Sequence, residues 1–218
     1  FDQIAQGMGG LMSITGAPGE GPMRVGIPIA DLTSGLFCAM GILTALLERE
    51  VSGQGQAVQT SLLHSQIFML DFQAARWLMQ HDVPKQAGNN HPTMIPTGVF
   101  RTSDGYMNIA ATGQVIWERL ANALGRADLI EQAEYRNPKL RSENRDALNA
   151  EIEKVTGAGT TTEWIEKLNK AGVPCGPIYT IDKVFEDAQV KHLDMVEYLF
   201  GFFFCDVNLV KQPFSLSR

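Results

Sequence analysis

The segment that decides the fold reads VGIPIADLTSG over residues 25–35, a short apolar run that ends in a single carboxylate, Asp31. Apolar residues at helical spacing follow it directly, at Leu36, Phe37, Met40, Leu43 and Leu47. We therefore expect a strand-like run up to Asp31 and a helix over residues 33–50. Two interpretations of Asp31 stay open. It is either a helix N-cap that accepts from first-turn amides, which the local sequence favours, or a nucleophile, since carboxylates form covalent acyl intermediates.

Composition excludes several classes of protein. The 218 residues suffice for one large or two small domains, 44% of them are hydrophobic, and the net charge is −6 with no run of Lys or Arg. This charge argues against a nucleic-acid partner and against an anionic membrane surface. No apolar run approaches the length of a membrane span and no signal peptide is visible, so we expect no membrane partner. The three widely spaced cysteines make a reducing, cytoplasmic location the default expectation.

Cysteine and histidine occur in no pattern that binds a metal. The three cysteines, at positions 38, 175 and 205, form no C-x-x-C pair, and the four histidines, at positions 64, 81, 91 and 192, lack ligand spacing. We predict no metal site and no disulfide framework. Cys175, between Pro174 and Gly176, is interpreted as a structural thiol.

The first part of the chain is predicted to form helices around one strand. We expect a helix over 2–13, a loop over 16–22, the long helix over 33–50 ending at Gly53, a strand over 57–62 and a helix over 63–80. Helix, strand and helix in succession indicate an α/β layer. The run Gly7–Gly10 lacks the full G-x-G-x-x-G spacing, so these glycines are assigned to close helix packing and not to a dinucleotide site.

The second part of the chain is predicted to form an α+β unit. After a Gly/Pro/Asn loop over 88–97 we expect strands over 98–101 and 105–111, joined by a turn at Asp104-Gly105. Helices over 114–124, 141–156 and 161–171 follow, the last opened by a capping box from Thr160 to Glu163. A strand over 178–181, a helix over 182–188 and a strand-like tail over 195–210 complete the prediction.

His91 lies in the loop between these two parts. Such a position suits ligand binding. The simpler interpretation is a turn residue whose ring caps nearby backbone groups, and the local sequence favours that.

Several segments, in this order, resemble the class III coenzyme A transferases, a family that includes formyl-CoA and carnitine CoA-transferases and the related α-methylacyl-CoA racemases. The resemblance covers nearly the whole chain and is specific because of the order of the motifs. The matching segments are residues 1–16, 24–35, 46–49 with 53–56, 88–92, 100–106 and 172–177.

The resemblance implies a fold and a domain organisation. The fold class is α/β, with a partial Rossmann-like large domain plus a smaller α+β domain, of the interlocked-dimer CoA-transferase type. Residues 1–80 would belong to the large domain, 81–97 would be a linker and active-site loop, 98–185 the small domain, and 186–218 a return segment. Family members are longer, and the part of them that precedes the match carries half of the sheet and most CoA-binding basic residues. We therefore expect a truncated chain and a homodimer, possibly interlocked.

The resemblance also implies chemistry. It places Asp31 at the catalytic aspartate, which carries acyl and CoA groups as an anhydride and a thioester. Substrates would be an acyl-CoA and a small carboxylic acid, with a coenzyme A thioester as substrate and no permanently bound cofactor. The residues that match the substrate- and CoA-binding positions are Phe1, Asp2, Gln6, Gly88, Asn89, Asn90, His91 and Pro92.

Two other functions stay open. The racemase branch has a histidine where this chain has Phe1, and phenylalanine cannot move a proton, so transfer is favoured over racemisation. The second alternative is a catalytically inactive, truncated scaffold that acts as an oligomerising or interaction module.

Overall fold

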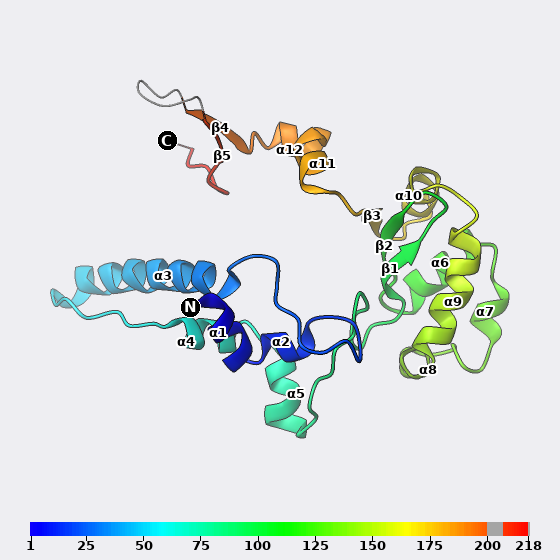
Figure 1. The fold of residues 1–218 in the computed structure, drawn as a ribbon, viewed down its shortest axis with the longest axis horizontal. Helices are drawn as coiled ribbons and strands as arrows, with labels where there is room; N and C mark the ends of the chain where they lie inside the picture. The colour runs from blue at the N-terminus through cyan, green and yellow to red at the C-terminus, as the bar shows by residue number, and fades with distance from the viewer. Residues whose placement is uncertain (200–206, 218) are drawn as a thin grey trace.

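The computed structural model describes residues 1–199 and 207–217. Figure 1 shows helices α1–α5, then a sheet of β1–β3 with α6–α10, then α11 and α12 before the hairpin β4–β5. The elements are α1 (Asp2–Met8), α2 (Leu11–Ile14), α3 (Ile29–Ser52), α4 (Leu62–Phe68), α5 (Phe72–Gln80), β1 (Thr97–Arg101), β2 (Tyr106–Ala110), α6 (Gln114–Ala123), α7 (Asp128–Glu131), α8 (Pro138–Glu143), α9 (Arg145–Thr156), α10 (Thr161–Lys170), β3 (Cys175–Pro177), α11 (Ile181–Glu186), α12 (Ala188–His192), β4 (Val196–Leu199) and β5 (Val207–Val210).

Helices α1, α3 and α4 pack against one another in the first part of the chain. A Cβ at Gly9 would overlap the fully buried Gln66 side chain of α4, so a glycine is needed at this contact. The packing role predicted for these glycines is confirmed at this position. Gly10 takes a left-handed conformation with φ of 82° and separates α1 from α2, which is why the helix predicted over 2–13 is broken.

The prediction of a strand over 57–62 is wrong, because those residues pair with no other strand in the part of the chain that the structure describes. A strand requires a neighbour to satisfy its backbone groups, and residues 1–80 contain none. The helix predicted over 63–80 is interrupted at residues 69–71, where Asp71 has a positive φ of 49°. The long helix ends as predicted, at Gly53 in the left-handed conformation.

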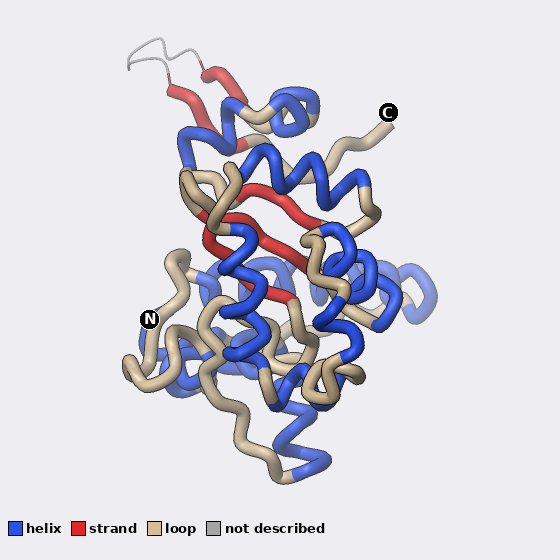
Figure 2. Tube along the Cα trace, turned by 90° about the vertical axis from the view of Figure 1, so that its right-hand side faces the viewer, coloured by secondary structure: helices blue, strands red, loops and turns tan. Residues whose placement is uncertain are grey.

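The three strands β1–β3 form an antiparallel sheet in the order β1-β2-β3. Alternate residues of the sheet, Phe100, Met107 and Ile109, are buried, and α9 and α10 pack on the sheet. Figure 2 shows the strands of this sheet in red with helices in blue around them. The three buried side chains join a core that includes Trp117, Leu120, Leu148, Ile152 and Leu168. Each such side chain contributes roughly 1.5–3 kcal/mol by leaving water. The predicted hairpin and the capping box at Thr160 are confirmed.

Three details of this unit differ from the prediction. The helix expected over 141–156 is split at Asn144 into α8 and α9, and the short helix α7 was not predicted. The last strand of the sheet is Cys175–Pro177 and not 178–181, because pairing with Met107 and Ile109 of β2 sets its position. That pairing is between distant parts of the chain, so local sequence does not specify it.

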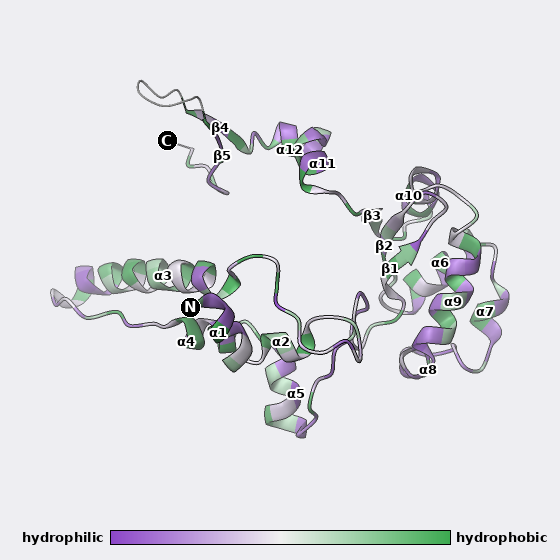
Figure 3. Ribbon diagram, in the orientation of Figure 1, coloured by the Kyte–Doolittle hydropathy of each residue, from purple (hydrophilic) through white to green (hydrophobic). Residues whose placement is uncertain are grey.

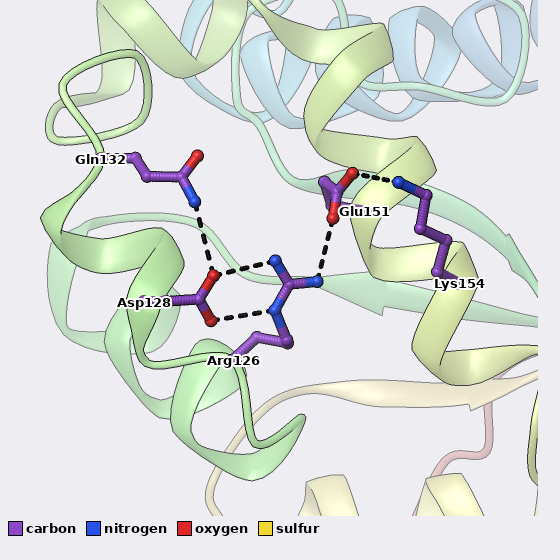
Figure 4. A network of polar contacts seen from close by, with 5 residues as sticks. All are labelled: Arg126, Asp128, Gln132, Glu151 and Lys154. Carbon is purple, nitrogen blue, oxygen red and sulfur yellow. Dashed lines mark hydrogen bonds and ion pairs between the residues drawn. The ribbon is translucent and has the colours of Figure 1, made fainter.

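An ion-pair network ties α7 to α9 (Figure 4). Arg126 donates to both carboxylate oxygens of Asp128 at 2.9 Å and to Glu151 at 2.9 Å, while Lys154 donates to Glu151. The hydrogen bonds to Asp128 and Glu151 raise the pKa of Arg126. The groups lie at the surface, so the network orients the short helix more than it stabilises the fold.

The chain beyond β3 contains α11, α12 and the antiparallel hairpin of β4 and β5, within the strand-like tail predicted over 195–210. The apolar centre of that tail falls largely at residues 200–206, outside the described residues.

Helix α3 is composed largely of apolar residues (Figure 3), and many of their side chains are exposed. Leu36, Met40, Leu43 and Leu47 are all more than 60% exposed. The helix has 24 residues and is apolar enough by composition to cross a membrane, so the prediction that no segment reaches such a length is wrong. Small residues such as Gly, Ser, Thr and Cys separate the apolar residues of α3, so the sequence shows no uninterrupted apolar run of this length, although such residues also occur in membrane-spanning helices. Core helices of water-soluble proteins pass the same test, and the length alone assigns no membrane.

Candidate functional site

Asp31 lies in the first turn of α3, two residues after the first helical residue, Ile29. The N-cap is Pro28, which makes no side-chain cap hydrogen bond, and Asp31 lies inside the helix, so the N-cap interpretation of Asp31 is wrong. The side chain is exposed, and its carboxylate makes no hydrogen bond or ion pair with any described residue. A carboxylate at this place benefits from the positive end of the helix dipole and stays free to react.

Two buried polar side chains of α1 hold the segment that leads into α3. Asp2 Oδ1 accepts a hydrogen bond from the Ala30 N–H at 2.9 Å. Gln6 is fully buried, and its Nε2 donates to Asp2 Oδ2 at 2.7 Å. Asp2 therefore takes the first-turn amide that an N-cap side chain would otherwise satisfy, although it lies 28 residues away in sequence.

Gln6 also binds the backbone of the approach segment. Its Nε2 donates to the Ile27 carbonyl at 3.3 Å, and its Oε1 accepts from the Val25 N–H at 3.0 Å. Arg24 lies 3.7 Å from Asp2 Oδ2 and completes the group. The position of Asp31 thus depends on α1, because α1 fixes both the approach to α3 and its first turn.

The second group of candidates is the loop that contains Gly88–Pro92. Asn90 forms a β-bridge with Gly98, and the His91 N–H donates to the Thr97 carbonyl at 2.8 Å. A Cβ at Gly98 would lie 2.8 Å from Asn90 Oδ1, so this contact requires glycine. Asn149 of α9 donates to Asn90 Oδ1 at 2.8 Å. The loop is therefore fixed to the sheet at the edge strand β1.

The same loop is tied to the first part of the chain. The Gly88 N–H donates to the Gly16 carbonyl at 3.0 Å. Gln86 Nε2 donates to the carbonyls of Thr15 and Gly21, both at 2.6 Å. Residues 86–98 therefore connect the helical part of the chain to the sheet through hydrogen bonds on both sides.

The His91 ring caps its own loop. Its Nδ1 accepts from the Met94 N–H at 3.0 Å and from the Thr93 N–H at 3.2 Å. The ring stacks on Phe72 of α5, with centroids 5.8 Å apart and planes 9° apart. The interpretation of His91 as a ring that caps backbone groups is confirmed.

The structure brings the candidates together in two groups. Asp2 and Gln6 lie at the base of Asp31, while Asn89, Asn90 and His91 lie in the loop on β1, and no hydrogen bond joins the two groups within the described residues. Phe1 precedes α1 and its side chain is fully exposed. The assignment of these residues to substrate and CoA stays a prediction.

The open face of the sheet carries residues that the sequence prediction missed. A cavity of about 510 Å³ is lined by Asn89, Val99, Gly105, Tyr106, Asn108 and Ile178. Tyr106 and Asn108 alternate with the buried Met107 on β2, and this polar alternation was the available signal.

Metal and thiol chemistry find no support among the described residues. No group of three or more metal-ligating side chains occurs over 1–199 and 207–217. Cys175 is half-buried, and burial raises the pKa of its thiol, which keeps it protonated. This agrees with its interpretation as a structural thiol.

The chain matches the family model described as CoA-transferase family III over residues 1–218. It is similar to succinyl-CoA:mesaconate CoA-transferase of Haloarcula marismortui, with 35% identity over 90% of this chain and 49% of that protein. It is also similar to succinyl-CoA:glutarate CoA-transferase of Mus musculus, with 34% identity over 90% of this chain and 45% of that protein. The chain thus spans about half the length of the curated relatives it matches.

A solved structure gives the same result for the fold. A CAIB/BAIF family protein from Brucella suis superposes with a TM-score of 0.83 at 33% identity, covering 100% of this chain and 56% of that one. The α/β fold class and the resemblance inferred from the sequence are confirmed.

Proposed function

Because the chain belongs to CoA-transferase family III, we propose that it carries the nucleophilic carboxylate of an enzyme that moves coenzyme A between an acyl-CoA and a free carboxylic acid. The proposal rests on the exposure of Asp31. Its side chain lies at the surface in the first turn of α3, and its carboxylate forms no hydrogen bond or ion pair with any described residue. A carboxylate used only for structure would be bound to backbone amides, as Asp2 is to Ala30.

The proposed reaction proceeds by four acyl substitutions at carbonyl carbons. The Asp31 carboxylate attacks the thioester of the donor, giving a mixed anhydride and the CoA thiolate. The thiolate attacks the aspartyl carbonyl, giving an aspartyl-CoA thioester and the free donor acid. The acceptor carboxylate attacks that thioester and releases the thiolate again. The thiolate then attacks the acyl carbonyl of the second anhydride, which yields the new acyl-CoA and restores Asp31.

The residues around Asp31 would position it and stabilise charge. In the first turn of α3, the Ala30 amide is taken by Asp2 and the Leu32 amide by the Pro28 carbonyl, whereas the Asp31 amide has no partner among the described residues. That amide is available as a donor to a developing oxyanion. We further propose that residues 81–97 form an active-site loop between a partial large domain (1–80) and a small domain (98–185), with 186–218 as a return segment.

The relatives suggest the class of acid. Their names specify succinyl-CoA with mesaconate or glutarate, and all three acids are short dicarboxylates. We propose a short dicarboxylate as the acid substrate of this chain. Specificity would be set by the open face of the sheet and by the loop over 88–92, whose Asn side chains have N–H groups that can donate to carboxylate oxygens.

The exposed surface of α3 supports a proposal about partners. Four leucine and methionine side chains of this helix are more than 60% exposed, which is unusual for a chain that acts alone. We propose that a second copy covers this surface in a homodimer. Sedimentation of the wild type and of Leu43→Glu tests this. A wild type that sediments as a dimer, together with a variant that the new charge dissociates into monomers, supports the proposal. A monomeric wild type would refute it.

Trapping of the covalent intermediate tests the function. The chain is incubated with succinyl-CoA and hydroxylamine, and the peptide that contains Asp31 is examined by mass spectrometry for the hydroxamate. Asp31→Ala should abolish trapping, whereas Glu50→Gln, an exposed acid at the other end of α3, should not. If the wild type traps nothing and behaves as Asp31→Ala does, the chain is an inactive scaffold and the proposal is refuted.

A further inference from the structure

The geometry of His91 fixes which ring nitrogen carries the proton. A backbone N–H can only donate, so the two amides that reach Nδ1, those of Met94 at 3.0 Å and Thr93 at 3.2 Å, require a lone pair on this atom. In the neutral imidazole the proton must therefore be on Nε2. Nε2 is a hydrogen-bond donor and has no partner among the described residues.

This arrangement is the reverse of a catalytic base. A histidine base has its Nδ1–H oriented by a carboxylate, which leaves the Nε2 lone pair free to accept a proton. Here Nδ1 accepts, and no carboxylate lies within ion-pair distance of His91 in the described part of the chain. His91 thus lacks both the free lone pair and the orienting acid of a base.

The residue that carries this donor, His91, is also held in place. Its ring stacks on Phe72 of α5, and its backbone N–H donates to Thr97 of β1 at 2.8 Å. His91 therefore has contacts with both parts of the chain that the loop connects, through its ring on one side and its backbone on the other. Pre-organised donors of this kind lose little entropy when they bind an oxygen.

We propose that His91 is a neutral hydrogen-bond donor, through Nε2–H, to an oxygen of the substrate, either the carboxylate of the acid or the carbonyl of the acyl-CoA, and that it does not act as a base. This inference rests on the proposed function for its substrate. The assignment of the tautomer rests on the geometry alone.

Nitrogen NMR tests the tautomer in the chain labelled with ¹⁵N-histidine. At pH 8, where an ordinary imidazole is neutral, the His91 ring should show a protonated Nε2 and an unprotonated Nδ1. His64, His81 and His192 serve as internal references, and loss of one signal set in His91→Asn assigns the resonances. A protonated Nδ1 would overturn the proposal.

Ligand titration identifies the oxygen. Succinate and acetyl-CoA are added in separate experiments to the labelled chain, and the Nε2 resonance is followed. A shift with succinate assigns a carboxylate as the acceptor, and a shift with acetyl-CoA alone assigns the thioester carbonyl. No shift with either ligand, in a protein that traps Asp31, overturns the donor role and leaves the proposed function standing.

Two variants separate the donor from a structural role. In His91→Asn the side-chain oxygen still accepts from amides two and three residues on, as Asn does in turns, but the distal donor is lost. In His91→Gln the longer amide restores a distal donor and the loop contact is lost. We expect kcat/KM for CoA transfer to fall about tenfold to a hundredfold in His91→Asn and clearly less in His91→Gln. The opposite order, with His91→Asn near wild type, would show a structural role and overturn the proposal.

Discussion

Replacement of Gln6 by leucine should loosen the entrance to α3 and displace Asp31. The amide of Gln6 is fully buried and joins three groups, the Asp2 carboxylate, the Ile27 carbonyl and the Val25 N–H. Leucine has a similar volume but offers none of these bonds. Each of the three partners would lose its hydrogen bond to Gln6, while Asp2 would keep the one from the Ala30 N–H, and two of the three belong to the backbone that leads into the helix.

The magnitude follows from these bonds. The hydrogen bond to the charged Asp2 is worth about 1.5–3 kcal/mol, and each of the two backbone bonds about 0.5–1.5 kcal/mol. Leucine regains roughly 1–2 kcal/mol because it buries apolar surface where Gln6 buried a polar group. The expected net loss in the free energy of unfolding is therefore about 0.5–5 kcal/mol, with a central value near 3 kcal/mol.

Gln3→Leu is the matched control, because Gln3 lies on the same helix, is exposed and makes no side-chain hydrogen bond with a described residue. Urea unfolding measures the free energy, and hydrogen exchange of the Val25 and Ala30 amides measures the local effect. We expect both amides to lose protection in Gln6→Leu only. Neutral surface substitutions change the free energy of unfolding by roughly 0.5 kcal/mol or less. If the free energies of the two variants differ by no more than this, the inference that Gln6 of α1 holds the entrance to α3 is wrong.

Three further predictions concern the α+β unit. Gly98→Ala should destabilise it by about 1–3 kcal/mol in urea unfolding, because the new Cβ would meet Asn90 and the Asn89 carbonyl, whereas Gly176→Ala on the same sheet meets open space and should cost far less. Arg126 holds the pKa of Asp128 below its usual value through hydrogen bonds, so this contribution to stability is present above pH about 4 and is lost as the pH falls through the folded pKa. NMR titration of Arg126→Met should return the Asp128 pKa toward its usual value, and an unchanged pKa would contradict the assignment. The Cys175 thiol, whose pKa burial raises, should react with iodoacetamide more slowly than free cysteine at pH 8, and equal rates would contradict its burial.

The sequence by itself determined the elements that depend on neighbouring residues. The strands β1 and β2 follow from alternation on either side of Asp104-Gly105, and α10 begins where Thr160 and Glu163 form a capping box. Gly53 ends α3 because a left-handed residue is needed there. These signals act over a few residues, so a single sequence contains them completely. The family resemblance likewise rests on the order of short motifs and was confirmed.

Only the tertiary structure decided how Asp31 is held. Local sequence favoured an N-cap, but the first-turn amide of Ala30 is bound by Asp2, 28 residues earlier, and Gln6 reaches Val25 across 19 residues. The orientation of the His91 ring, which lies in a loop, depends in the same way on Phe72 of α5. Such contacts form between segments that meet only when the chain folds, and their geometry leaves no pattern in the nearby sequence. That is why the sequence identifies a carboxylate and a loop, whereas the fold decides which of their atoms remain free for chemistry.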